Sequence, residues 1–207
     1  MSRLRVINLG LPKSGTTTFG RALKLSGLRI ADHRIRPRQT DDTALHDRFV
    51  AELVYEDYFA TGDPLARLEH FDGIAEISML RRERSLWPQT DWGVIAAIRA
   101  HHPGARFVAT RRPAEAMSAS MDRWNDLGRE RLPTLAVPGL PQGWGATLAE
   151  RQRWIEAHHA HLRRLFAGAA DFLELDVTAA DAPDGLGAFL GRDIRWWGRA
   201  NASRAAG

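Results

Sequence analysis

Apolar and polar residues follow two periods along this chain, one typical of strands and the other of helices. Short apolar runs predict buried strands, and apolar residues spaced three and four positions apart predict helices. The expected strands cover residues 4–9, 28–31, 71–79, 106–110 and 171–175. The expected helices cover residues 16–26, 43–59, 92–101, 113–127, 147–166 and 184–190. Strands that alternate with helices predict an α/β fold with a mainly parallel sheet flanked by helices.

The first strand, loop and helix form the most informative stretch, LRVINLGLPKSGTTTFGRALKL at residues 4–25. A strand, a glycine-rich loop and a helix together direct backbone N–H groups at a phosphate. The spacing is nearly that of a nucleoside-triphosphate P-loop, in which a lysine follows the second glycine. Here Thr16 takes that position, and the lysine lies earlier in the loop. The expected phosphate-binding residues of this loop are Lys13, Ser14, Gly15, Thr16, Thr17 and Thr18.

A second basic stretch, RFVATRRPAEAMSASMDRW at residues 106–124, follows the same plan of strand, turn and helix. The arginine pair Arg111 and Arg112 comes directly after the expected strand. Parallel sheets bind their ligands at the carboxyl ends of the strands. Both basic stretches are therefore expected at the same edge of the sheet.

The segment GLPKSGTTTF resembles the 5′-phosphosulfate-binding loop of sulfotransferases, in which PKSGT is followed by threonine and an aromatic residue. Those enzymes transfer a sulfuryl group from 3′-phosphoadenosine 5′-phosphosulfate (PAPS) to a hydroxyl or amine. The resemblance implies a P-loop-like three-layer sandwich, Lys13 as a catalytic residue and adenosine 3′,5′-bisphosphate as a product. It also implies a small-molecule or glycan acceptor and a reaction that requires no metal.

The second stretch resembles the 3′-phosphate-binding segment of the same family, where an arginine ends a strand and a serine follows about eight residues later. Two registers fit. Arg111 with Ser118 matches the arginine–proline pattern and is the first choice, and Arg112 with Ser120 has the usual spacing. Near the C-terminus, Arg199 is a further candidate for covering the 3′-phosphate.

The acceptor must lose a proton, so a general base is expected near Lys13. In the family this base lies at or after the strand between the two nucleotide segments. Glu76 in FDGIAEISM is the first candidate. Three other residues remain as alternatives: Asp72, His70 and His33.

Composition limits the remaining possibilities. The chain has 207 residues, which fits a single domain over 1–207, with a Pro/Gly-rich lid or acceptor loop at 128–145 and a frayed tail at 202–207. It has no cysteine, no apolar run long enough to span a membrane and no leader pattern, which favours a cytoplasmic protein. The net charge of +4 is scattered, which argues against nucleic acid as a partner. A homo-oligomer is compatible with the sequence.

Two other functions remain open at this stage. The segment FLELD, ending at Asp176, could serve as the second acidic strand of a P-loop kinase or NTPase. A non-catalytic nucleotide-binding module of the same fold is the other alternative. The position of Lys13 favours the sulfotransferase over the kinase.

Overall fold

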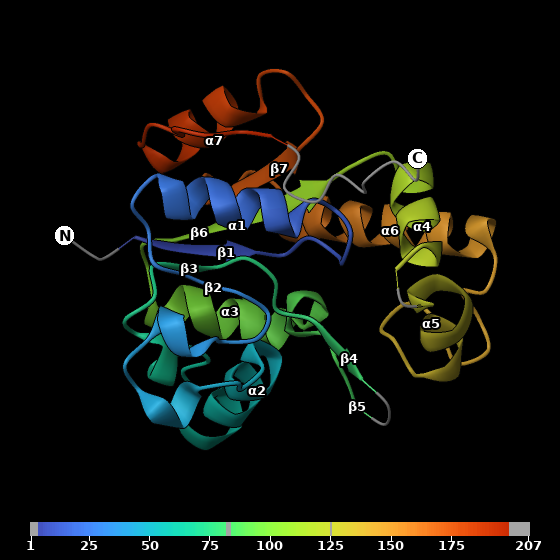
Figure 1. Cartoon of the computed structure of the whole chain (residues 1–207), viewed down its shortest axis with the longest axis horizontal. Helices are drawn as coiled ribbons and strands as arrows, with labels where there is room; N and C mark the ends of the chain where they lie inside the picture. Colours follow the sequence, from blue (N-terminus) through green and yellow to red (C-terminus); the bar gives the residue numbers. More distant parts are fainter. Residues whose placement is uncertain (1–3, 82–83, 125, 199–207) are drawn as a thin grey trace.

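Five parallel strands form the centre of the molecule in the computed structural model, which describes residues 4–81, 84–124 and 126–198 (Figure 1). Their order is β2-β3-β1-β6-β7, and every neighbouring pair is parallel. Their bounds are β1 Arg5–Asn8, β2 Ile30–Ala31, β3 Gly73–Ile74, β6 Ala105–Arg111 and β7 Phe172–Asp176. The expected α/β class with a parallel sheet is confirmed. Arg199 and the expected tail 202–207 lie outside the described residues.

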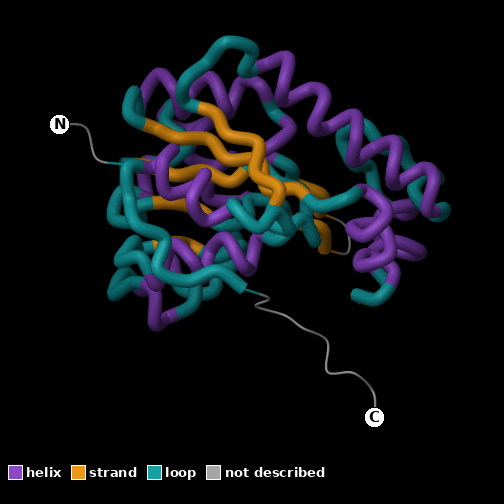
Figure 2. Tube along the Cα trace, turned by 90° about the horizontal axis from the view of Figure 1, so that it is seen from above, coloured by secondary structure: helices purple, strands orange, loops and turns teal. Residues whose placement is uncertain are grey.

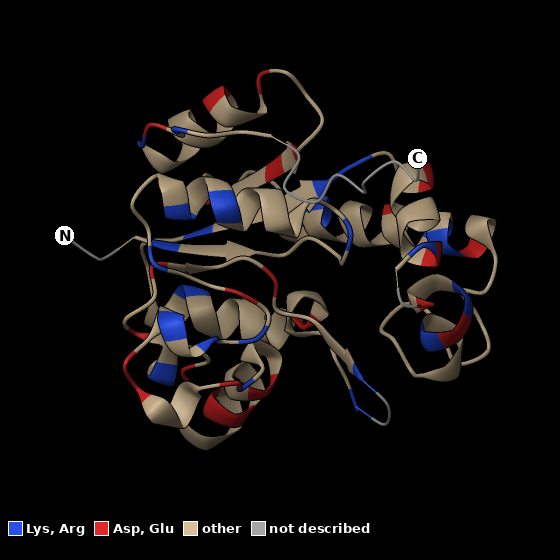
Figure 3. Cartoon of the chain, in the orientation of Figure 1, with Lys and Arg blue, Asp and Glu red and all other residues tan. Residues whose placement is uncertain are grey.

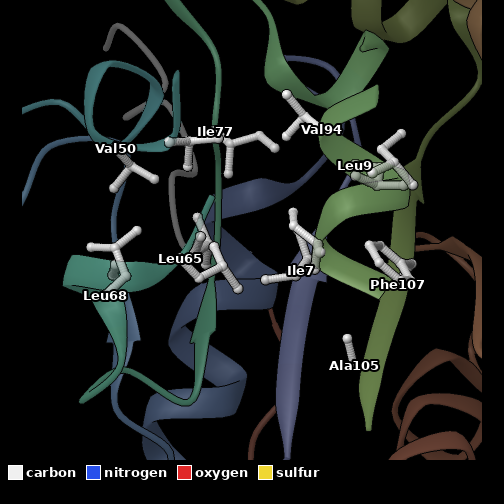
Figure 4. Packing of buried hydrophobic residues seen from close by; sticks show 14 of the residues in the cluster. Ile7, Leu9, Val50, Leu65, Leu68, Ile77, Val94, Ala105 and Phe107 are labelled. Carbon is white, nitrogen blue, oxygen red and sulfur yellow. The ribbon is translucent and has the colours of Figure 1, made fainter. Parts of the chain in front are cut away.

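Helices cover both faces of this sheet (Figures 1 and 2). On one face, α1 and α7 pack apolar side chains such as Phe19 and Leu186 against Val6 and Val108. On the other face, α2, α3 and α6 pack against Ile7 and neighbouring strand residues. Figure 4 shows Val50 of α2 and Val94 of α3 near Ile7. The helices are α1 Thr16–Leu25, α2 Val50–Thr61, α3 Trp92–His101, α4 Ala114–Asp122, α5 Leu132–Thr134, α6 Leu148–Leu165 and α7 Ala182–Leu190. This layering is compatible with a three-layer sandwich.

A third apolar cluster lies beyond the carboxyl ends of the strands. It joins Leu11 of the first loop to Met117 and Met121 of α4 and to Trp154 of α6. The chain after α4 contributes a π-helix at Leu127–Arg131 and then α5. This cluster faces the edge of the sheet where the candidate site lies. None of the helices in the described ranges has the length and apolar character needed to cross a membrane.

Two sequence-based boundaries are wrong on the first half of the chain. The helix expected from residue 43 begins at Val50, because the preceding residues form a 3-10 turn at Thr43–Leu45 and Asp47 has a positive φ of 61°. The strand expected over 71–79 pairs with the sheet only at Gly73–Ile74. Its last residue, Met79, belongs instead to an antiparallel hairpin, β4 Met79–Arg81 with β5 Arg84–Leu86. Apolar content alone does not show where a strand leaves the sheet.

Two further expectations fail after β6. The helix expected over 113–127 ends at Asp122. The expected loop 128–145 holds most of the π-helix and all of α5, which pack their leucines Leu127 and Leu132 into the third cluster. Proline and glycine between residues 133 and 145 masked this short helical content.

Candidate functional site

The loop after β1 is tied to the end of β6 by a buried polar network. The Oδ1 atom of Asn8 accepts hydrogen bonds from the backbone N–H of Gly10 at 2.9 Å and of Thr110 at 3.2 Å. The hydroxyls of Ser14 and Thr110 lie 2.6 Å apart. A side chain at Gly10 would overlap Thr110, which explains the glycine. Ser14 is fully buried in this network, so its hydroxyl supports the loop and does not face solvent.

The residue at the N-cap of α1 is a glycine. Gly15 precedes the helix with φ 109°, a conformation that suits glycine, and it has no side chain with which to cap the first turn. The first N–H groups of a helix have no carbonyl partner inside the helix, and they carry a partial positive charge. Thr17 is exposed at this end. This helix end can therefore donate to an anion.

Lys13 lies in the same loop, in a left-handed backbone conformation with φ 71°. Its side chain is half-buried, and its Nζ lies 4.7 Å from the centre of the Trp124 ring. Burial lowers the pKa of the Lys13 ammonium, the carboxylate of Glu76 raises it, and Arg112 and Arg123 lower it. Two arginines and one carboxylate thus act on Lys13 at the edge of the sheet.

Glu76 follows β3, the strand next to β1, and reaches the first turn of α1. Its Oε2 accepts a 2.8 Å hydrogen bond from the hydroxyl of Thr16, and its Oε1 accepts a 3.2 Å bond from Ser78. The structure therefore brings this base candidate to the loop that holds Lys13. The side chain of Thr16, at the position where a nucleoside-triphosphate P-loop has lysine, is turned toward a carboxylate.

The three alternative bases lie elsewhere. Asp72 and His70 precede β3, at the amino end of the strand, and Asp72 accepts a 2.7 Å hydrogen bond from the backbone N–H of Arg29. His33 follows β2 and is exposed, with its ring 6.0 Å from that of Phe49. The structure does not bring these side chains to Lys13.

The two arginines after β6 point to different neighbours. Arg111 lies 3.5 Å from the carboxylate of Glu174 on β7. It also acts on His159, whose pKa falls to about 4 through burial and then through Arg111 and Arg163. Arg112 acts instead on Lys13. Both arginines line a pocket of about 110 Å³ between α4 and α6. Of these two arginines, Arg112 is the one that acts on Lys13 in the glycine-rich loop.

The two candidate serines also differ. Ser118 is fully buried, and its hydroxyl accepts a 2.8 Å hydrogen bond from the Nε of Arg151. Arg151 is itself buried and paired with Asp122 at 2.8 Å. Ser120 is partly exposed on the same helix. Ser118 is therefore part of the contact between α4 and α6.

The last described residues of the chain contact α1. The hydroxyl of Thr18 donates a 3.0 Å hydrogen bond to the carbonyl of Gly198. The ring of Trp196 lies 4.5 Å from the guanidinium of Arg21 on α1. The segment just before Arg199 thus lies against the first helix, and Arg199 itself is outside the described residues.

Sequence reasoning missed the aromatic and basic side chains that follow α4. Trp124 contacts both Lys13 and Arg131, with the Arg131 guanidinium 5.7 Å from its ring centre. Arg123 acts on Lys13. A tryptophan directly after Arg123 was the signal available, and it does not reveal which loop lies beside it.

Two histidines of α6, His158 and His159, are buried. The Nε2 of His158 lies 2.8 Å from the carbonyl oxygen of Leu9, and burial lowers its pKa to about 4. His159 is also buried, and its Nδ1 lies 3.1 Å from Glu174. In the described ranges, no group of three or more His, Asp or Glu residues is arranged to hold a metal ion.

The arrangement can bind an anion at α1 and supply a carboxylate beside it. A comparison with protein-family models found no match, and no curated protein matches the chain. The chemistry of these residues therefore carries the functional argument that follows.

Proposed function

We propose that this protein is a sulfotransferase that moves a sulfuryl group from PAPS to a hydroxyl or amine of an acceptor. The observation that carries the proposal is the position of Lys13. It lies inside the loop, beside the N-terminus of α1 and a carboxylate, while Thr16 occupies the position of a triphosphate-binding lysine. The loop and the N-terminus of α1 can bind an anionic group, and Lys13 can stabilise the charge of a leaving group next to it.

The residues present fit the donor at its 5′ end. The N-terminus of α1, which begins after Gly15, can donate backbone N–H groups to the 5′-phosphosulfate, with Lys13 in the preceding loop. At the 3′ end the structure supports the second register, because Arg112 acts on Lys13 and Ser120 is partly exposed. Arg111 and Ser118 are engaged with Glu174 and Arg151.

PAPS, when bound, supplies a sulfuryl group on an oxygen that can leave with the 5′-phosphate. As the acceptor oxygen or nitrogen bonds to sulfur, the bond from sulfur to the bridging oxygen breaks. Lys13 stabilises the negative charge that develops on the departing oxygen. Glu76 takes the proton of the acceptor, and its hydrogen bonds from Thr16 and Ser78 hold the carboxylate in place.

A P-loop kinase or NTPase is the alternative in the enzyme class, and the structure gives it little support. Asp176 ends β7, which is the outer strand of the sheet and is separated from β1 by β6. Its Oδ1 accepts hydrogen bonds from the backbone and hydroxyl of Thr178. The Asp176 carboxylate therefore stabilises the turn that follows β7.

Calorimetry with adenosine 3′,5′-bisphosphate and with ATP plus magnesium tests the proposal. We expect the bisphosphate to bind at least tenfold more tightly, and Lys13→Met to weaken that binding. Lys24→Met is the matched control. Lys24 is the other lysine of the chain; it lies on α1, and its Nζ is 2.7 Å from the carboxylate of Asp32. A preference for ATP with magnesium would contradict the proposal. Bisphosphate binding with no transfer to any acceptor would favour a non-catalytic module.

A further inference from the structure

The β4–β5 hairpin meets the π-helix after α4 close to Lys13. The Nη2 of Arg131, in the π-helix, donates a hydrogen bond to the carbonyl of Leu80 in β4. Its guanidinium and the Nζ of Lys13 both contact the ring of Trp124, at 5.7 and 4.7 Å from its centre. Lys13 and Arg131 therefore both lie beside the same indole ring. Figure 3 shows basic residues on the hairpin and on the segment after α4.

Arg81 adds a second guanidinium at this place. It is exposed next to Leu80, and it lies 5.2 Å from the ring centre of Phe49. Burial lowers the pKa of Arg131, and the positive charge of Arg81 lowers it further. Two like charges thus lie close enough to repel each other.

Neither guanidinium is paired with a carboxylate among residues 4–81, 84–124 and 126–198. Arg84, on the opposite strand of the hairpin, differs because it forms an ion pair with Glu52. Within the same ranges, the guanidinium of Arg131 donates one hydrogen bond, to the backbone carbonyl of Leu80. The remaining N–H donors of Arg81 and Arg131 are therefore available to a ligand. A planar guanidinium pair matches the oxygens of a carboxylate, sulfate or phosphate.

We propose that Arg81 and Arg131 bind an anionic group of the acceptor while its hydroxyl or amine lies at Lys13 and Glu76. This inference rests on the proposed function and adds the substrate class: an acceptor that already carries a carboxylate, sulfate or phosphate. The Trp124 ring contacts both Lys13 and Arg131, and so lies next to both ends of this acceptor site. An anion between the two guanidiniums would also offset their mutual repulsion.

A site-resolved titration tests the anion site without requiring turnover. Full-length protein labelled with ¹⁵N-arginine is saturated with adenosine 3′,5′-bisphosphate and titrated with sodium sulfate, with sodium chloride at equal ionic strength as the reference. We expect saturable shifts of the Arg81 and Arg131 Nε–H signals. Arg81→Gln and Arg131→Lys should each weaken this binding at least tenfold. Arg99→Gln is the control, because Arg99 is paired with Asp171 at 2.9 Å on another face.

Unshifted Arg81 and Arg131 signals, or an affinity for sulfate unchanged in both variants, would overturn the inference. Because Arg81 is exposed, Arg81→Gln is expected to fold even if Arg131→Lys does not. Failure of the bisphosphate to bind would contradict the proposed function, while the arginine signals would still report on the anion site.

Matched acceptors identify the source of the anionic group. With labelled donor, 4-hydroxyphenylacetate is compared with 2-(4-hydroxyphenyl)ethanol, and a uronic-acid oligosaccharide with a neutral one. We expect the charged member of the accepted pair to have at least a tenfold higher kcat/KM, and Arg81→Gln to remove this preference through KM. Equal or better transfer to the neutral member would overturn the inference. The pair that reacts distinguishes a small acid from a glycan.

Discussion

The hydroxyl of Thr16 donates a 2.8 Å hydrogen bond to the carboxylate of Glu76, across the gap between α1 and the chain after β3. This contact places a carboxylate where the first turn of α1 begins. It also joins two segments that lie 60 residues apart in the sequence. The same carboxylate acts electrostatically on Lys13 in the preceding loop. The contact therefore holds the proposed general base next to the loop that carries Lys13.

Glu76→Gln should lower turnover at least a hundredfold and change the affinity for adenosine 3′,5′-bisphosphate by less than about threefold. A positioned general base contributes about 10²–10⁴-fold to a rate. The glutamine can still accept the hydrogen bond of Thr16, so the loop should keep its structure. Steady-state kinetics and calorimetry on the same preparations make the measurement. Glu115→Gln, on the exposed first turn of α4, is the control. Full activity of Glu76→Gln would remove Glu76 from the mechanism.

The amine of Lys13 should titrate below its ordinary value of 10.5. Burial lowers its pKa, and the nearby Glu76 carboxylate opposes this shift, so Glu76→Gln should lower the pKa further. As the pH rises, the Lys13 ammonium therefore loses its proton at a lower pH than an ordinary lysine does. The chain has two lysines, so ¹³C-methylated protein gives two lysine signals beside that of the α-amine, with Lys24 as the internal reference. A Lys13 pKa at or above 10.5 would contradict the described burial.

Arg112→Gln should weaken bisphosphate binding about tenfold to a hundredfold, the range expected for losing a charged hydrogen bond. Arg111→Gln should leave it within about threefold, because Arg111 faces Glu174. Likewise, Ser120→Ala should weaken binding, and Ser118→Ala should mainly lower the stability of the protein by depriving Arg151 of an acceptor. A larger loss of affinity in Arg111→Gln than in Arg112→Gln would restore the register favoured by the sequence alone.

The sequence predicted the parts of the site that depend on local pattern. The strand, loop and helix over residues 4–25 and the helix at 92–101 form nearly as expected, because glycine spacing and apolar periodicity determine them locally. The resemblance to sulfotransferases points to Glu76, because it lies in the expected strand between the two nucleotide segments. The order of the strands then placed it beside Lys13.

The sequence could not predict contacts that depend on packing between distant segments. Met79–Arg81 and Arg84–Leu86 form a hairpin too short to be recognised from its pattern. The burial of Ser118 depends on Arg151, 33 residues away on α6. Trp124 reaches Lys13 only because α4 ends at Asp122 and the chain turns there. These contacts decide which serine and which arginine remain available to a ligand.

Acidification should destabilise the protein through His158. Its pKa is about 4 in the folded protein and about 6.5 when exposed, because burial disfavours the charged imidazole. A lowered pKa means that the unfolded state takes up protons first. The stabilisation is therefore complete above pH 6.5 and is lost as the pH falls from about 6.5 to about 4.

Each pKa unit corresponds to about 1.4 kcal/mol, so His158 alone contributes a loss of about 3 kcal/mol over that range. Urea unfolding at several pH values between 7 and 4 measures this loss in the free energy of unfolding. His158→Gln should unfold more easily at pH 7, yet depend less on pH below 6.5. His161→Gln, exposed on the same helix, is the control. An identical pH dependence of His158→Gln and the natural protein would show that His158 is not protonated upon unfolding.

Gly15→Ala should destabilise the protein by about 1–3 kcal/mol more than Gly27→Ala. Both glycines have positive φ, 109° and 85°, so both substitutions introduce backbone strain. A side chain at Gly15 would also approach Val177 to 2.6 Å, whereas nothing lies within 4 Å of one at Gly27. Overpacking of this kind typically costs about 1–3 kcal/mol. Urea denaturation of the two variants gives the difference. Adding Val177→Ala to Gly15→Ala should recover most of it, because the smaller side chain removes the clash; no recovery would assign the loss to the backbone of the loop.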